Sequence, residues 1–169
     1  VDTVTTAAGT WADRLFRVTV ADGQLAAALA DLGGADTVAA VNAIEVRAPS
    51  LRFDFGTPTS PLEPGYLRVA HGSRYGAAAG FGWLTGTVES RDRGVGSARA
   101  RALNFTRVAT FAVDLPNGAY HLTATMGDIK HEHDLAAVDA EGKRLGMVTT
   151  AAGEIVQLAN TATVKDSQL

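Results

Sequence analysis

One hexapeptide occurs twice in this chain. "VTTAAG" stands at 4–9 and again at 148–153. Over the longer segments 4–25 and 148–169, an offset of 144, eleven of 22 positions are identical without a gap. The identical positions of the first copy are Val4, Thr5, Thr6, Ala7, Ala8, Gly9, Thr19, Val20, Asp22, Gln24 and Leu25. An offset of about one domain length predicts a unit of a tandem array, cut out of phase, and not a solenoid of short repeats.

Composition removes several classes of protein. The 169 residues include no cysteine, so a disulfide or cysteine–zinc framework is excluded. The net charge of −3 argues against a nucleic-acid partner, which usually needs a basic face. No apolar run approaches the roughly 18 residues of a membrane-spanning helix. The sequence shows no signal peptide and no initiator Met, and we expect a piece of a processed or larger protein.

Strand-like patterns dominate the chain. Apolar residues alternate in short runs, and the runs are separated by turn signals such as "PNG" at 116–118 and Glu141-Gly142. Segment 56–104 is rich in glycine and arginine, which is typical of long loops with short strands. Many short strands with glycine turns predict an all-β antiparallel sandwich or barrel. The predicted strands are 14–20, 24–31, 42–46, 51–55, 110–115, 119–126 and two within 134–146.

Several motifs together resemble a known family. They are "ADGQL" (21–25), "NAIEV" (42–46), "FDFGTPTSPLEPGYLRV" (53–69), "GFGW" (80–83), "RDRG" (91–94), "FAVDLPNGAYHLTATMGD" (111–128), "HD" (133–134) and "VTTAAGE" (148–154). These resemble the galactose-binding-like, malectin-like β-sandwich modules of bacterial polysaccharide-degrading enzymes, such as rhamnogalacturonan acetylesterases and lyases. The resemblance implies a jelly-roll sandwich and covers nearly the whole chain.

The order of the motifs agrees with the internal repeat. In the family "FDFG" would come first and "NAIE" last, whereas here "NAIEV" precedes "FDFG". Residues 1–46 are therefore expected to be the end of one repeat, and 51–169 the start and middle of the next. A single sandwich over 1–169 would then be closed by the N-terminal segment in permuted fashion. The alternatives are a swapped dimer or an open chain of swapped copies, a homo-oligomer formed by strand exchange.

The two homologous segments would compete for one position in such a sandwich. The first copy has Phe16 and Val18 where the second has Asn160 and Ala162. Burial of a Phe or Val side chain stabilises by about 1.5–3 kcal/mol. We therefore predict that 14–20 occupies the core position, and that 159–169 is marginal, at an edge or disordered.

Candidate carbohydrate-binding residues combine aromatic rings with arginines. Rings bind the C–H faces of sugars, and the guanidinium fork binds hydroxyls or both oxygens of a uronate carboxylate. Phe81 and Trp83 lie on one strand face, which also favours a place in the core. Arg91 and Arg93 can equally form a solvated or ion-paired loop. The candidates are Tyr66, Arg74, Tyr75, Trp83, Arg91 and Arg93.

A second cluster combines carboxylates with imidazoles in "GDIKHEHD" (127–134). Such groups suit zinc or another transition metal, so a divalent metal is one possible cofactor. The alternative is a polar loop whose side chains bond the backbone. The "GD…HD" pattern of the resembling family implies this structural role. The candidate ligands are Asp128, His131, His133 and Asp134.

No catalytic residue is assigned. Ser73 in "HGSRYG" does not fit a nucleophile elbow, and Asp54 is implied by the resemblance to be structural. Three functions are consistent with the sequence. The first is a non-catalytic module that binds a polysaccharide, with rhamnose or uronic acid, for a secreted enzyme. The second is a structural spacer or self-associating domain without a sugar site. The third is the sandwich part of a polysaccharide lyase or esterase.

Overall fold

The computed structural model describes residues 3–10, 12–16, 18, 25–33, 38–45 and 50–169. The chain divides into two compact units, Val1–Ala48 and Pro49–Leu169. Each unit is considered by itself. Within the described ranges, no helix is long and apolar enough to cross a membrane.

Regular structure in the described residues is almost entirely β and lies in the second unit. One short helix, α1 (Ala98–Arg101), interrupts the strands. The strands are β1 (Phe53–Phe55), β2 (Leu67–Val69), β3 (Phe81–Gly86), β4 (Glu89–Asp92), β5 (Ala102–Phe105), β6 (Ala109–Val113), β7 (Gly118–Gly127), β8 (His133–Ala140), β9 (Lys143–Thr150) and β10 (Ile155–Val164).

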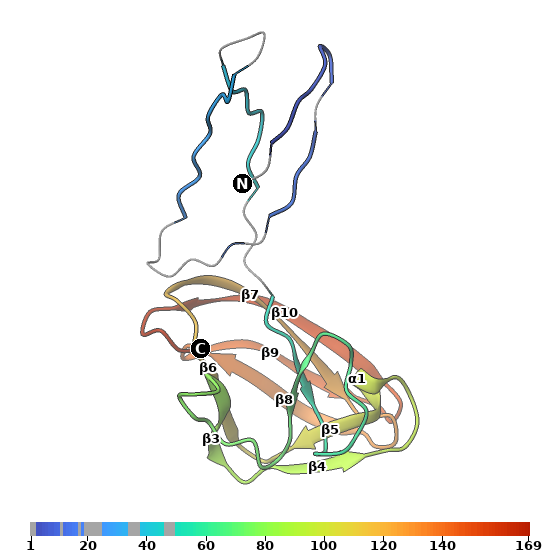
Figure 1. Cartoon of the computed structure of the whole chain (residues 1–169). Helices are drawn as coiled ribbons and strands as arrows, with labels where there is room; N and C mark the ends of the chain where they lie inside the picture. Colours follow the sequence, from blue (N-terminus) through green and yellow to red (C-terminus); the bar gives the residue numbers. More distant parts are fainter. Residues whose placement is uncertain (1–2, 11, 17, 19–24, 34–37, 46–49) are drawn as a thin grey trace. The chain divides into compact units, whose positions relative to one another are not determined.

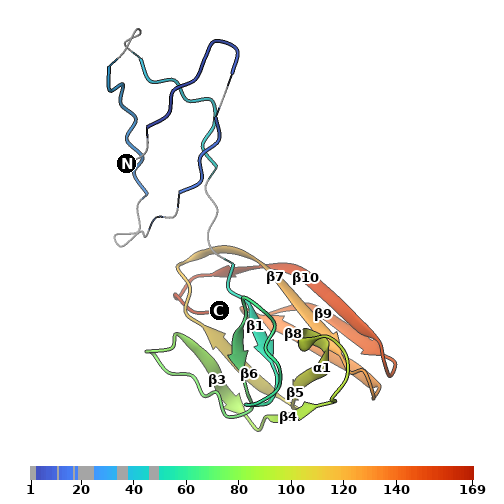
Figure 2. The same ribbon diagram turned by 45° about the vertical axis from the view of Figure 1, so that its right-hand side comes forward.

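The strands pair mainly in antiparallel fashion. In the described part of the chain, β3 pairs with β6, β4 with β5, β7 with β10 and β8 with β9, all antiparallel, while β1 and β2 are parallel. The strands up to β6 lie on one side of the unit and β7–β10 on the other (Figures 1 and 2). The prediction of an all-β, galactose-binding-like sandwich is confirmed.

Two turns illustrate how the sequence sets this topology. At Glu141 and Gly142 both φ angles are positive, 53° and 71°, as a two-residue turn between antiparallel strands requires, and β8 and β9 form the predicted hairpin. The strands flanking "PNG" also form, as β6 and β7. They do not pair with each other, because β6 pairs with β3 and β7 with β10.

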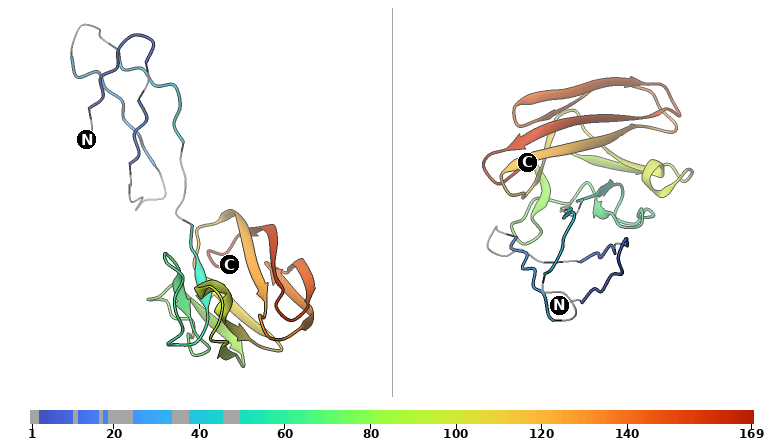
Figure 3. Two further views of the ribbon diagram at one scale, coloured as in Figure 1. Left: turned by 90° about the vertical axis from the view of Figure 1, so that its right-hand side faces the viewer. Right: turned by 90° about the horizontal axis from the view of Figure 1, so that it is seen from above.

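The long β7–β10 ladder shows why these segments are strands. Along β7 the side chains alternate between half-buried and exposed, in agreement with the period of two of a strand. Leu122 lies opposite Asn160, and Tyr120 lies opposite Ala162. On β10, Ala162 and Val164 are 5% and 1% exposed. The inner face of this ladder is therefore a main wall of the core (Figure 3).

A cluster of half-buried aromatic rings is a second packed group of side chains. Five rings pack with centroid separations of 5.0–6.4 Å, at tilted or edge-on angles that aromatic pairs favour. The indole N–H of Trp83 donates to the carbonyl of Ala70 at 3.1 Å. The rings belong to Phe53, Phe55, Phe81, Trp83 and Phe111.

The prediction that 14–20 occupies the core position, with 159–169 marginal or disordered, is wrong, whereas a place for 159–164 at an edge is not contradicted, because β10 pairs with β7 alone in the described part of the chain. β10 pairs with β7 from Ile155 to Val164, so 159–164 lies in a ladder and its end is buried. In the first copy, Phe16 and Val18 are 60% and 64% exposed. The described residues of 14–20, 24–31 and 42–46 form no strand, and residues 17, 19–24 and 46 lie outside the described part.

The physical reason is the shape of the position beside β7. The Asn160 side-chain amide donates to the carbonyl of Leu145 at 2.9 Å, and Ala162 faces the ring of Tyr120 across the ladder. This position suits an amide and a small side chain, and the more apolar Phe16 and Val18 would overfill it. That 1–46 and 51–169 are parts of successive repeats stays a prediction.

Candidate functional site

A pocket of about 520 Å³ lies in the second unit, where β4 and β5 meet the loop that follows β7. Six of its lining residues have ionisable side chains and approach from different elements, so the pocket gathers charge. Leu103 and Phe105 add an apolar wall. The lining residues are Arg91, Arg93, Leu103, Phe105, Asp128, His131, Glu132 and His133.

The register of two strands places half of these side chains on one face. Arg91 of β4 lies opposite Leu103 of β5 in an antiparallel pair. Arg93 and Phe105 are each two residues further along, and the amide of Arg93 donates to the carbonyl of Arg101 at 2.9 Å. Because side chains of a strand alternate with a period of two, all four point to the same side. This side faces the β7–β8 loop.

Two glycines position the loop. Gly127 ends β7 at φ +126°, and a Cβ there would lie 2.1 Å from the carbonyl oxygen of Glu154, so only glycine allows this approach. The next residue, Asp128, accepts the amide of Gly153 on its main-chain carbonyl at 2.9 Å. Gly153 belongs to the second "VTTAAG". The repeated hexapeptide therefore supports the loop that carries the pocket's carboxylate.

Asp128 is the best-anchored side chain of the pocket. Its side chain is 0% exposed. The Nε of Arg93 lies 3.0 Å from Oδ1 and 3.1 Å from Oδ2, and a terminal guanidinium nitrogen contacts Oδ2 as well. The Lys130 amide donates to Oδ1 at 2.8 Å. Burial by itself would raise the pKa of Asp128, but the bonds from Arg93 and the Lys130 amide hold it at about 2. Asp128 is therefore ionised at neutral pH, and its negative charge neutralises the positive charge of Arg93.

The remaining polar groups are open to a ligand. Among the described residues, no carboxylate forms an ion pair with Arg91, which is exposed. His131 and Glu132 are exposed as well. The Nε2 atom of His133 is buried without a hydrogen-bond partner, 3.6 Å from Oδ2 of Asp128. This atom is covered by protein beside Asp128, so the exposed polar groups that the pocket offers a ligand are Arg91, His131 and Glu132.

The structure separates the six carbohydrate candidates into four groups. Arg91 and Arg93 line the pocket. Tyr66 lies instead between two other arginines, with Arg52 5.9 Å from its ring centroid and Arg99 3.3 Å from its hydroxyl. Trp83 belongs to the aromatic cluster.

Arg74 and Tyr75 lie beside β3, away from the pocket lining. Arg74 donates to the Gly86 carbonyl at 3.2 Å, and the Tyr75 hydroxyl donates to Asp114 at 2.9 Å and 3.0 Å. Both side chains are therefore held by the protein itself. Whether any of the six residues binds sugar stays a prediction.

Three of the four metal candidates line the same pocket, and Asp134 does not. In the described ranges, no group of three His, Cys, Asp or Glu side chains has an arrangement that could hold a metal ion. Asp128 already accepts hydrogen bonds on both oxygens. Its geometry agrees with the structural role that the "GD…HD" resemblance implied, and a divalent metal stays an untested expectation.

Sequence reasoning missed Leu103, Phe105 and Glu132. Leu103 and Phe105 alternate in β5, but the neighbouring glycine-rich sequence concealed this short strand. Glu132 stands between the two histidines that had been selected. Leu103 and Phe105 could have been found by pairing 102–105 with 89–92 as two antiparallel strands.

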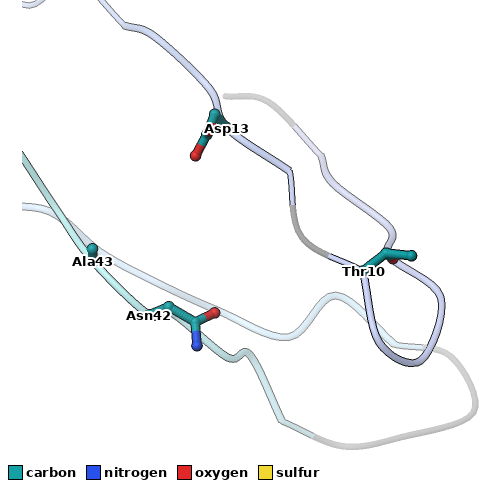
Figure 4. A pocket seen from close by; sticks show the side chains of 4 residues that line it. All are labelled: Thr10, Asp13, Asn42 and Ala43. Carbon is teal, nitrogen blue, oxygen red and sulfur yellow. The ribbon is translucent and has the colours of Figure 1, made fainter.

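Another hollow lies in the first unit, lined by Thr10, Asp13, Asn42 and Ala43 (Figure 4). The described residues around it form no strand or helix and are exposed. Its four described lining residues offer no cation and no aromatic ring. It is therefore a weaker candidate than the pocket of the second unit.

Comparison with known proteins identifies the family. Residues 51–169 match the family described as "Beta-agarase/YXIM esterase-like, galactose-binding domain-like". The chain belongs to this family. The predicted resemblance to galactose-binding-like modules of polysaccharide-degrading enzymes is confirmed. The malectin-like character and the tandem arrangement stay predictions.

Similar proteins are larger enzymes. The chain is 37% identical over 128 residues to Beta-agarase A of Zobellia galactanivorans, covering 72% of this chain and 23% of that protein. It is 36% identical over 97 residues to the uncharacterized esterase YxiM of Bacillus subtilis, covering 54% and 24%. The crystal structure of the Bacillus subtilis YxiM protein superposes with a TM-score of 0.53 at 27% identity, covering 70% of this chain and 33% of that one. The chain thus spans about a quarter of the length of these two curated relatives.

Proposed function

We propose that the second unit is a carbohydrate-binding accessory module of a secreted polysaccharide-degrading enzyme. The observation that carries this proposal is the pocket in which the unpaired cation Arg91 stands beside an apolar wall of Leu103 and Phe105. Sugars combine apolar C–H faces with polar rims, so such a pocket is complementary to them. Membership of a galactose-binding-like family of larger enzymes supports the same function.

The charges favour an acidic sugar. Arg93 is neutralised by Asp128, but Arg91 keeps its charge and its five donors for a ligand. A guanidinium binds both oxygens of a carboxylate more specifically than it binds a hydroxyl. We therefore propose a uronate-containing polysaccharide, with Arg91 as the group that binds the carboxylate.

A binding role suits the buried charges better than a catalytic one. Hydrolysis or elimination would need a carboxyl or imidazole with a pKa near the working pH. The pKa of Asp128 is about 2, and its oxygens are engaged by Arg93 and Lys130. Asp128 is therefore suited to fix Arg93 and the loop, and the reaction would be performed elsewhere in the larger enzyme.

Titration calorimetry of the full chain with polygalacturonate tests this function, with neutral agarose as the comparison glycan. We expect weak binding of polygalacturonate, roughly millimolar to micromolar, as is usual for a module that acts through multivalency. The substitution Arg91→Ala should weaken it about tenfold, because a charge-assisted hydrogen bond is lost.

The matched control is Arg107→Ala, which removes another exposed arginine that does not line the pocket. It should bind like the unmodified chain. Equal losses in both variants would refute the pocket as the site, and the absence of binding to either glycan would refute the function. Tighter binding of agarose than of polygalacturonate would replace the acidic ligand by a neutral one.

A further inference from the structure

One edge of β6 has a partner along only part of its length. β6 pairs with β3 on one side, with Phe111 opposite Trp83. On the other side, the amide of Val113 donates to the carbonyl of Leu169 at 2.8 Å, and the amide of Leu169 donates to Val113 at 2.9 Å. From Phe111 to Ala109, no strand among the described residues lies along this edge.

The two reciprocal bonds fix the register of any strand that extends this pairing. They mark Val113 and Leu169 as a hydrogen-bonded pair of an antiparallel ladder. Hydrogen-bonded and non-hydrogen-bonded pairs alternate, so the main-chain groups of Phe111 and Ala109 face the same edge as those of Val113. An edge of this kind is a template for a further strand.

The internal repeat contains a second segment whose sequence fits this edge of β6. Leu25 is the counterpart of Leu169 at the offset of 144, and the residues after it are "AAALAD", 26–31. Continued from Leu169, this segment places Ala27 opposite Phe111 and Leu29 opposite Ala109. Side chains opposite each other share a face, so Leu29 falls on the side of the aromatic cluster that contains Phe111.

The segment is available for pairing. Residues 25–33 are described and exposed, and they form no strand in their own unit. Leu29 is 58% exposed and Leu25 is 44% exposed. Leu25 and Leu29 are four positions apart, so they share one face of an extended segment, and the residues between them are small alanines. The chain therefore contains both an open strand edge and an exposed segment that matches it.

We propose that residues 26–31 of a second copy of this chain add to the free edge of β6. The added strand runs antiparallel to β6 and continues the pairing of Leu169, with Ala27 opposite Phe111. Each copy carries one edge and one segment, so the contact is heterologous. It gives dimers when two copies close on each other and longer assemblies when they do not.

Engineered disulfides test the register and the source of the strand. The chain has no cysteine, so introduced thiols are unique. In the proposed ladder Ala28 faces Thr110 as a non-hydrogen-bonded pair, whose Cα separation of about 4.5 Å suits a disulfide. The full chain with Ala28→Cys is mixed with the full chain carrying Thr110→Cys under mild oxidation. We expect a mixed dimer joined by a disulfide between the two introduced thiols, identified by mass spectrometry after digestion.

The control replaces Ala28→Cys by Ala39→Cys, an exposed position of the same unit outside 26–31. It should give at least tenfold less mixed dimer. Equal yields would overturn the proposed register. A double variant with Ala28→Cys and Thr110→Cys in one chain tests the source of the strand. A disulfide that forms only within this one chain, and never between the two mixed single variants, would overturn the second copy as the source.

Proline substitutions test the same contact without a covalent bond. In the proposed register the amide of Ala27 donates to β6, whereas the amide of Ala28 points away. Ala27→Pro should therefore weaken self-association at least tenfold, and Ala28→Pro should leave it unchanged, because proline is tolerated where an edge amide faces solvent. Light scattering of the full chains at several concentrations gives the mass. A monomeric unmodified chain at all concentrations, or equal effects of the two prolines, would overturn the proposal.

Discussion

The two copies of "VTTAAG" have the same local structure. In the first copy the amide of Thr10 donates to the carbonyl of Ala7 at 3.1 Å, and in the second the amide of Glu154 donates to Ala151 at 3.1 Å. Gly9 and Gly153 both have positive φ angles, 76° and 87°. Identical residues therefore make the same turn in both units, because its hydrogen bond and its glycine lie within the repeated segment or directly beside it.

Their surroundings differ. The second copy joins β9 to β10, buries Thr150 to 2% exposure and contacts Asp128 through Gly153. The described residues of the first copy are exposed and flanked by no strand. A turn can therefore form from neighbouring residues alone, whereas a strand forms only where its residues pair with a partner strand.

The largest expected effect tests this contrast at one pair of equivalent positions. Ala162 is 5% exposed beside Tyr120, and its counterpart Val18 is 64% exposed. Ala162→Asp should lower the free energy of unfolding by at least about 3 kcal/mol, because a charge without a partner becomes buried. Val18→Asp should change it by less than about 0.5 kcal/mol. Urea unfolding followed by circular dichroism measures the free energy of unfolding of both variants. Similar losses in the two variants would contradict the different surroundings of the two copies.

Low pH should lower the free energy of unfolding of the second unit, in which the second copy contacts Asp128. The folded pKa of Asp128 is about 2, below its ordinary value of 3.8, so the unfolded chain takes up this proton first. The resulting stabilisation is complete above about pH 5 and is lost as the pH falls through 2, on the order of 2 kcal/mol. Urea unfolding between pH 5 and 2 should show this loss. Asp128→Asn should reduce the slope, and an unchanged slope would contradict the assignment.

The smallest expected effect concerns the turn itself. A Cβ at Gly153 or Gly9 meets little or no neighbouring structure, so only the positive φ opposes a side chain there. Gly153→Ala should destabilise the second unit by about 1 kcal/mol. Gly9→Ala should leave that unit's melting temperature unchanged, since it alters a turn that joins no described strand. A lower melting temperature in both variants would mean that the first copy supports the sandwich.

Much of the fold could be predicted from short-range patterns. The β8–β9 hairpin followed from "EG" at 141–142, and β1 from the alternation around Phe53. The pairing of β7 with β10 could not, because it depends on space beside Leu145 and Tyr120 that only the assembled strands define. Hydrophobicity alone favoured Phe16 and gave the wrong strand.

The candidate site could be predicted only in part. Arg91, Arg93, Asp128, His131 and His133 were selected from the sequence, but as members of two separate clusters. Their meeting in one pocket depends on the pairing of β4 with β5 and on the close approach of Gly127 to Glu154. Neither contact has a signature within a single run of residues.

The all-β class, the turns and the internal repeat follow from the amino-acid sequence alone, because they depend on periodicity and on residues close together in the chain. The tertiary structure decided which copy of the repeat became a strand, which arginine was neutralised by Asp128 and which stayed free. These outcomes depend on the shape and charge of distant segments, and such properties exist only once the strands have packed.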